Sequence, residues 1–411
     1  MRTHSRRHGL AGTVAAAVVA VLAGTPAPAT ATTVSTDAAT APPRAALGWG
    51  STCKRLGGVG TTAPVSTSAP APGVTVKVYP FTQADGSVTQ VSVARADLTK
   101  VRLLPMSQPR IGTVRTVLSA ARARNAPVAV NGDFFELGTE TEALTYGPQA
   151  RGGSVAYFAG DRPYVGVDAA GLPLHGTATL AGTVTFTDPR TRKVLRTMTV
   201  TRVNTAASSG GTALWTQAVH PDNYRYGPYP VLVRQGRVVG RASQLTDLRS
   251  IPVWRKPFVL APTRAADIAW LKLRVSRTAT VKVSVKVVDA ATGTPLRDTL
   301  GAGMLAMHRG TPVAECGSLR PRTVVAWTAD RRTAWFVTAN GTPSTWSFWV
   351  GASYKQMGQL LAWLGADEGR FLDGGGSTTM VVANHGTYRR VDGGILDYLR
   401  AVPVGYAFTP R

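Results

Sequence analysis

The sequence predicts a mixed, strand-rich α+β fold in a single domain, in which two αβ units present a shared cleft. Three observations support this prediction. Most of the chain consists of short segments in which apolar and polar residues alternate, as in half-buried strands. Two other segments have a helical period, and each leads into an apolar strand and a polar loop. The hydrophobic content of 44% is ample for a buried core.

The first 31 residues have the layout of a secretory signal peptide. A basic start precedes an apolar stretch over residues 10–23, and small residues stand at Ala29 and Ala31. We expect export with cleavage near Ala31, and an uncleaved N-terminal anchor is the alternative. No later segment offers about 18 continuous apolar residues. The mature chain is therefore predicted to lack a membrane span and to be secreted, either extracellular or associated with the cell wall.

The chain is strongly basic, and its formal net charge of +24 falls to +21 once the three arginines of residues 1–31 are removed. In an exported protein this charge favours anionic wall polymers, phosphoglycans or lipid headgroups over nucleic acid. The alternative is that an Ala- and Arg-rich composition reflects genomic base bias, because the arginines are scattered along the chain.

Residues 32–73 are rich in Ala, Pro, Thr and Ser, which is the composition of a linker, and residues 74–411 form the predicted domain. The chain has two cysteines, Cys53 and Cys316. In an oxidising compartment an even pair favours a disulfide that ties the N-terminal approach to the core. Two separately buried thiols are the alternative.

The first αβ unit follows several strands. Residues 74–78 and 88–93 alternate around a turn at 84–87, which predicts a β-hairpin, and residues 98–104 form a further strand. Residues 112–126 have a helical period with Thr113 as a cap, and Pro127 ends the predicted helix. A buried strand over residues 128–130 then leads into a polar loop at residues 131–135.

The region from residue 152 to residue 301 shows mostly strand patterns between Gly, Pro, Asp and Asn turns. In this region and beyond it, the predicted strands cover residues 163–167, 183–186, 194–203, 231–239, 281–288, 304–308, 324–328 and 334–338.

The second αβ unit begins with a helix capped by Ser353 and ended by Gly365. A short apolar strand at residues 371–372 then leads to Asp373. We infer that the two units carry Asp133 and Asp373 to comparable ends of one sheet, where the loops converge on one cleft.

Three consecutive glycines follow Asp373, and three hydroxyl residues follow the glycines. Each glycine in a strand-like setting costs roughly 0.5–1 kcal/mol relative to alanine, so the run indicates positive φ angles or close approach of a ligand. Unobstructed backbone N–H groups can form an anion-binding concavity, and the hydroxyl groups add donors. For Asp133 and Asp373 the alternative is an acid that caps its own turn.

Six segments, in this order, resemble the phosphodiester glycosidase family, which has many bacterial secreted members. They are residues 131–135 (NGDFF), 322–325, 336–341, 364–366, 372–381 (LDGGGSTTMV) and 400–404. The resemblance covers residues 74–408 and implies a mixed α+β catalytic domain that hydrolyses a sugar-1-phosphodiester. Where many relatives have an acid before Gly341, this chain has Asn340, which argues against a catalytic carboxylate at that position.

Such a reaction requires contacts for the phosphate and a carboxylate near the anomeric carbon, and glycosidases use paired carboxylates for this purpose. We predict Asp133 and Asp373 as the catalytic pair, with Arg322 and Arg400 on phosphate oxygens. The predicted substrate-binding residues are Asn131, Gly132, Phe135, Arg322, Asn340, Gly374, Gly375, Gly376, Ser377, Thr378, Thr379 and Arg400. Core packing is the alternative for Phe135, and solvated or ion-paired side chains are the alternative for the arginines.

No metal or other cofactor is predicted, because the histidines are isolated and no two have helical zinc spacing. A hard cation such as Ca²⁺, bound by Asp133 or Asp373 with backbone carbonyls, is compatible with the same loops.

The leading hypothesis is a secreted hydrolase that cleaves the sugar C1–phosphate bond in a wall polymer or glycoconjugate. Two alternatives stay open. One is a non-catalytic exported module that binds anionic wall polymer, and the other is a glycosidase of the same fold that acts on a phosphate-free glycan.

Overall fold

The structure is a computed structural model, and the residues that it describes lie in one compact unit that spans Pro43–Arg411. They are residues 54–108, 110–139, 142–219, 227–241, 257–274, 279–313, 315–341, 351–384, 386–392 and 399–411. The predicted signal peptide and Cys53 lie outside the described residues. No described cysteine is a free thiol, and the pairing of Cys53 with Cys316 stays a prediction.

The predicted α+β fold class is wrong, because strands make up 53% of the structure and helices only 9%. The helices in the described ranges are α1 (Val117–Arg122), α2 (Ala265–Arg274) and α3 (Tyr354–Leu364). The helix predicted over residues 112–126 is reduced to α1, with Thr116 as the N-cap in place of Thr113. The preceding residues form β5 (Arg115–Thr116), which pairs with the distant β27 (Ala401–Val402). Pairing with a remote strand thus outweighs the local helical period.

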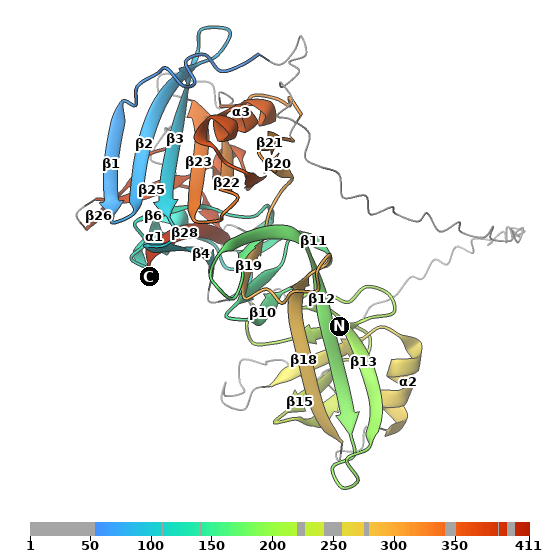
Figure 1. Ribbon diagram of the computed structural model, residues 1–411. Helices are drawn as coiled ribbons and strands as arrows, with labels where there is room; N and C mark the ends of the chain where they lie inside the picture. Colours follow the sequence, from blue (N-terminus) through green and yellow to red (C-terminus); the bar gives the residue numbers. More distant parts are fainter. Residues whose placement is uncertain are drawn as a thin grey trace, which may run out of the picture. The chain divides into compact units, whose positions relative to one another are not determined.

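The described chain forms a first sheet of eight strands in the order β1-β2-β3-β23-β22-β24-β20-β21 (Figure 1). Its strands are β1 (Ser66–Ala71), β2 (Val74–Thr82), β3 (Val88–Asp97), β20 (Leu305–His308), β21 (Thr311–Pro312), β22 (Arg322–Trp327), β23 (Thr333–Gly341) and β24 (Glu368–Phe371). The predicted hairpin is confirmed as β2–β3. Because β1 pairs with β2, the region predicted as a linker ends before Ser66.

Helix α3 packs against β20, β21 and β22. It begins at Ser353 as predicted, where a capping box with Gln356 satisfies two backbone N–H groups, and it ends at Gly365 with φ 78°. Its apolar face, which includes Met357 and Leu360, is fully buried. This helix therefore fixes the sheet from which the glycine loop, residues 373–379, departs.

A second sheet of five described strands has the order β26-β25-β6-β28-β4. Its strands are β4 (Val101–Ser107), β6 (Val128–Asn131), β25 (Met380–Asn384), β26 (Thr387–Arg390) and β28 (Val404–Pro410). The two sheets share one apolar core, in which Phe336 of β23 stacks on Phe408 of β28 with ring centroids 4.0 Å apart. The glycine loop joins β24 to β25, so it carries the chain from the first sheet to the second.

A third sheet of eleven described strands has the order β10-β9-β19-β11-β12-β13-β14-β17-β15-β16-β18. Its strands are β9 (Gln149–Arg151), β10 (Ser154–Tyr157), β11 (Arg162–Val167), β12 (Pro173–Thr187), β13 (Val194–Val203), β14 (Thr212–Trp215), β15 (Val231–Arg234), β16 (Arg237–Arg241), β17 (Phe258–Pro262), β18 (Thr280–Asp289) and β19 (Asp298–Gly301). The strand predicted over residues 231–239 is instead a hairpin of β15 and β16. A separate ribbon pairs β7 (Phe135–Thr139) with β8 (Glu142–Thr145).

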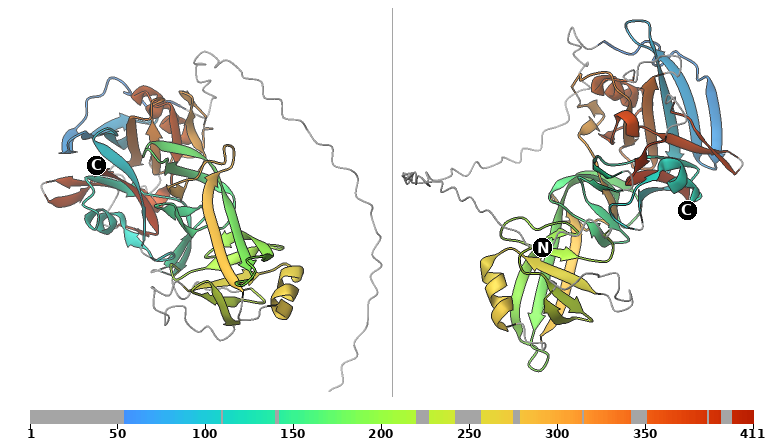
Figure 2. Two further views of the ribbon diagram at one scale, coloured as in Figure 1. Left: turned by 60° about the horizontal axis from the view of Figure 1, so that its bottom comes forward. Right: turned by 180° about the vertical axis from the view of Figure 1, so that it is seen from behind.

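Helix α2 packs on the third sheet, where the Trp270 and Phe186 rings lie 4.9 Å apart. Arg196 of β13 forms an ion pair with the buried Asp267 of this helix. Both views of Figure 2 show α2 beside the long strands of this sheet. None of the helices in the described ranges is both long and apolar enough to cross a membrane.

Candidate active site

The two acidic loops meet in the structure. The backbone N–H of Asp373 donates to the carbonyl oxygen of Gly132 (2.8 Å), and the Asn131 side-chain amide donates to the Asp373 carbonyl oxygen (2.7 Å). The strands that precede the loops belong to different sheets, β6 to the second and β24 to the first. The expectation of comparable ends of one sheet is therefore wrong, although the loops are adjacent.

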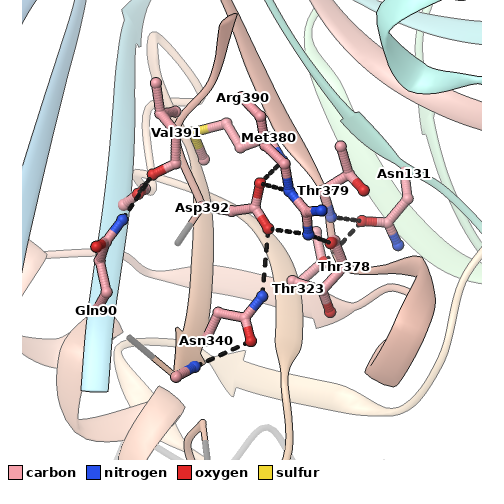
Figure 3. A network of polar contacts seen from close by, with 12 residues as sticks. Gln90, Asn131, Thr323, Asn340, Thr378, Thr379, Met380, Arg390, Val391 and Asp392 are labelled. Atoms are coloured by element: carbon pink, nitrogen blue, oxygen red, sulfur yellow. Dashed lines mark hydrogen bonds and ion pairs between the residues drawn. The ribbon is translucent and has the colours of Figure 1, made fainter. Parts of the chain in front are cut away.

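The buried Asn131 holds this arrangement together. Its Oδ1 accepts hydrogen bonds from the Thr323 hydroxyl (2.8 Å) and from the Thr379 backbone N–H (3.1 Å) (Figure 3). One side chain thus joins the end of β6, strand β22 and both sides of the glycine loop. These contacts give Asn131 a positioning role in place of the predicted contact with substrate.

Gly132 has a structural reason to be glycine. A Cβ at this position would lie 2.9 Å from Val404 Cγ2 and 3.0 Å from the backbone nitrogen of Gly405. The close approach of β28 therefore accounts for this glycine without a ligand.

Asp133 is 3% exposed, and its Oδ2 accepts a hydrogen bond from the Gly147 backbone N–H (2.7 Å). The backbone of Gly301 also packs against this carboxyl group, because a Cβ there would collide with Oδ2. Burial raises the pKa of Asp133 to about 7, the Gly147 hydrogen bond opposes the shift, and the Asp373 charge adds to it. Asp133 therefore titrates near neutral pH.

Asp373 lies at the start of the glycine loop and is partly exposed. Burial raises its pKa, while the Ser377 hydroxyl, the Gly374 N–H and the Arg400 guanidinium act in the opposite direction. The Gly374 N–H donates to Asp373 Oδ1 at 2.8 Å. The structure thus brings together the two predicted catalytic acids in different environments, with a cation beside Asp373.

The glycine loop forms a 3₁₀ turn over Gly375–Ser377, and Gly375 has φ 56°, which favours glycine. Protein acceptors already engage two of the three glycine amides. Gly374 donates to Asp373, and Gly375 donates to the Pro321 carbonyl oxygen (2.9 Å). The anion-binding concavity predicted from three free amides is therefore largely filled by the protein itself.

Arg400 lies against the third glycine. A Cβ on Gly376 would be 3.2 Å from the Arg400 Cζ atom, so the absence of a side chain leaves room for the guanidinium. Arg400 is partly exposed. The structure therefore places this predicted phosphate ligand at the glycine loop.

The three hydroxyl residues after the glycines are all buried. The Thr379 backbone N–H donates a hydrogen bond to Asn131 Oδ1. The Ser377 hydroxyl acts on the Asp373 carboxyl group and lowers its pKa. The Thr378 hydroxyl has no hydrogen-bond partner among the described residues, and because buried hydroxyls are normally satisfied, a water or ligand contact would satisfy it.

The Arg322 side chain lies on the face of the first sheet opposite to the one that faces β6. Its Nε donates to the Ala352 carbonyl oxygen (3.3 Å), its Nη2 donates to that of Ser318 (3.0 Å), and the guanidinium lies 3.7 Å from the centroid of the Tyr354 ring. Its neighbour Thr323 points to the opposite face, toward β6, because successive strand side chains alternate. The structure does not bring Arg322 to the two aspartates, and the predicted phosphate contact is not supported.

Asn340 belongs to a network that sequence reasoning missed (Figure 3). Its Nδ2 donates to Asp392 Oδ2 (3.3 Å), and this fully buried carboxylate accepts two 2.7 Å hydrogen bonds from Arg390. Asp392 also accepts from the Met380 N–H (3.2 Å), just after the glycine loop. Asp392 lies two residues after the end of β26 at Arg390, and the close spacing of these opposite charges is the available sequence signal.

Phe135 packs against the apolar cluster that covers α1. The partner side chains in this cluster include Val117, Ala120 and Val381. Phe135 is only partly buried, so its contacts agree with the core packing that the sequence left open, and its predicted sugar contact stays a prediction.

A cavity of about 540 Å³ lies elsewhere, beside β4, β11 and β19. Four arginines line it, together with Asp298: Arg102, Arg151, Arg297 and Arg411. Neither predicted catalytic aspartate lines this cavity. It is a basic site separate from the paired acids.

Two solved structures with TM-scores above 0.5 support the fold. A Synechocystis protein aligns with a TM-score of 0.61 and 18% identity over 85% of this chain, which spans 64% of that protein. A Burkholderia pseudomallei protein aligns with a TM-score of 0.56 and 19% identity over 79% of this chain and 74% of its own. A third structure is the zebrafish N-acetylglucosamine-1-phosphodiester α-N-acetylglucosaminidase catalytic domain, auto-inhibited by its pro-peptide. It aligns with a TM-score of 0.41 and 13% identity, and the alignment covers 85% of this chain and 88% of that chain.

A search of curated proteins found no match. The family model for phosphodiester glycosidases matches residues 255–409. This range contains Asp373, Arg400 and the glycine loop, whereas Asp133 lies before it. The predicted resemblance is confirmed for this part of the chain: residues 255–409 match the phosphodiester glycosidase family model.

Proposed function

We propose that the protein is a secreted phosphodiester glycosidase that hydrolyses the bond between a sugar C1 and a phosphate. One observation carries the proposal. Two carboxyl groups with raised pKa values, Asp133 and Asp373, lie in adjacent loops joined by a backbone hydrogen bond, with Arg400 beside the second. Groups with perturbed pKa values tend to gather at functional sites.

The different surroundings of the two acids suggest different roles. Asp133, with a pKa of about 7, keeps its proton up to neutral pH and supplies it to the leaving phosphate oxygen. In this scheme Asp373 faces the anomeric carbon as a carboxylate, and Arg400 and the Gly374 N–H favour that charged form against the burial that raises its pKa. The guanidinium of Arg400 binds the phosphate oxygens. The phosphate is a good leaving group, so the demand on Asp133 is smaller than in hydrolysis of an ordinary glycoside.

The test is hydrolysis of a synthetic N-acetylglucosamine-1-phosphodiester by purified variants. We expect kcat/KM to fall about 10²–10⁴-fold in Asp373→Asn and in Asp133→Asn. Asp161→Asn, which removes an exposed acid, serves as the matched control and should retain wild-type activity. Wild-type rates in both active-site variants would refute the assignment. NMR of the first-formed sugar anomer then distinguishes Asp373 as a base from Asp373 as a nucleophile.

The basic charge and the arginine-lined cavity support an anionic polymer as the larger substrate. Polyphosphate is a suitable probe, and binding should weaken steeply with salt. The double variant Arg151→Glu/Arg297→Glu should bind less than Arg190→Glu/Arg237→Glu, which makes the same charge change at two exposed arginines outside the cavity. Equal losses in the two variants would contradict a specific role for the cavity. Polymer binding without hydrolysis of any phosphodiester would favour the non-catalytic module.

A further inference from the structure

A cluster of two histidines and a glutamate lies outside the paired acids. His175 Nε2 is 2.7 Å from Glu368 Oε2, and His308 Nδ1 is 3.0 Å from the same oxygen. One potential ligand atom from each side chain lies within 4.8 Å of the other two. In the part of the chain that the structure describes, this is the one group of three such residues with this geometry.

The three residues come from separate parts of the chain. His175 lies on β12 of the third sheet, whereas His308 and Glu368 lie on β20 and β24, which are neighbours in the first sheet. Their separations in sequence hide the cluster, which explains why the histidines looked isolated. The fold alone assembles this group.

We propose that His175, His308 and Glu368 form a binding site for a zinc-type divalent cation. Two imidazole nitrogens and one carboxylate oxygen are a common donor set for Zn²⁺, with a fourth position left for water. The same set disfavours Ca²⁺ and Mg²⁺, which prefer oxygen ligands. The site is thus chemically distinct from a hard-cation site at the acidic loops.

The surroundings fix the ligands while leaving an approach for the ion. The His175 ring packs on Trp327 with centroids 5.5 Å apart, and the Arg309 N–H donates to the second Glu368 oxygen (3.3 Å). The side chain of His308 is 44% exposed, compared with 13% for His175 and 17% for Glu368. A cation can therefore enter from the His308 side and replace the two hydrogen bonds to Glu368 Oε2.

Binding of the ion has a structural consequence. It would join β12 to β20 and β24 through coordination. A ligand that binds only the folded state raises its stability. We therefore expect Zn²⁺ to raise the melting temperature by several degrees.

Calorimetric titration of metal-free, tag-free protein with Zn²⁺ tests the site. Wild type should bind one ion more tightly than His308→Ala and Glu368→Gln by at least tenfold, and Co²⁺ should give a tetrahedral absorption spectrum that both variants lose. Glu315→Gln, which removes an exposed glutamate, should match wild type. His308→Ala alters an exposed side chain, and circular dichroism checks that it folds.

Equal Zn²⁺ affinity in wild type and in both variants would overturn the proposal. So would a wild-type protein that shows neither the binding event nor the cobalt spectrum. These readouts are independent of phosphodiester hydrolysis, so failure here leaves the proposed function to its own test.

Discussion

The backbone N–H of Asp373 donates a 2.8 Å hydrogen bond to the carbonyl oxygen of Gly132. This bond joins the residue before Asp133 directly to the second acid. The loops come from strands of different sheets, so the hydrogen bond is a tertiary contact that sets the relative positions of the two carboxyl groups. The charge of Asp373 consequently contributes to the raised pKa of Asp133.

Asp133 should make folding stability depend on pH. Its pKa rises from 3.8 in its ordinary state to about 7 in the fold, so between these values the folded state holds a proton that the unfolded state has lost. Stability should therefore fall as pH rises from about 4 to 7, by on the order of 4 kcal/mol if Asp133 acts alone. Urea unfolding across this range should show the loss in wild type relative to Asp133→Asn. Parallel pH curves for the two proteins would contradict the assignment.

Loss of the Asn131 side chain should destabilise the protein and displace the glycine loop. Asn131→Ala leaves the Thr323 hydroxyl, the Thr379 N–H and the Asp373 carbonyl oxygen without their partner. We expect a loss of about 2–4 kcal/mol, because each unsatisfied buried group costs about 1–3 kcal/mol and the effects overlap. Chemical denaturation measures this loss, and kcat/KM should fall with it. Asn384→Ala, at an exposed strand end, is the matched control and should change little.

A methyl group at Gly301 should act directly on the Asp133 carboxyl group. The Cβ of Gly301→Ala would collide with Asp133 Oδ2 and with the Gly147 Cα atom, so the carboxyl group must move. We expect a loss of about 1–3 kcal/mol and reduced hydrolysis. Gly240→Ala provides the comparison, because no atom lies within 4 Å of its new Cβ. Thermal melts and activity indistinguishable between the two variants would show that Asp133 has room to move.

Removal of Asp392 should be among the most damaging changes near the glycine loop. This carboxylate is fully buried, whereas the side chain of its partner Arg390 is 19% exposed. Asp392→Ala removes the buried carboxylate that pairs with the Arg390 guanidinium, and we expect a loss of about 3–5 kcal/mol in the free energy of unfolding. The double variant Arg390→Met/Asp392→Leu should recover part of this loss, as measured by urea unfolding. A double variant less stable than Asp392→Ala would show that the remaining polar partners dominate.

Local features of the sequence were sufficient for several elements. The hairpin β2–β3 and helix α3 with its Ser353 and Gly365 ends follow from alternation, capping and a left-handed glycine, all of which act within a few residues. The motif in the glycine loop also predicted the phosphodiester glycosidase family, whose model matches residues 255–409. The helical period of residues 112–126 did not predict the length of the helix, because strand pairing with residues 401–402 shortens it.

The tertiary structure alone decided how these pieces act together. The sequence determined that Asp133 and Asp373 each follow an apolar strand, but their contact depends on a hydrogen bond between strands of two sheets. Likewise, only the folded chain turns Arg322 toward Tyr354 and brings His175 to Glu368. The physical reason is that hydrogen bonds, burial and charge interactions act through space, and residues far apart in sequence become neighbours only when the sheets pack.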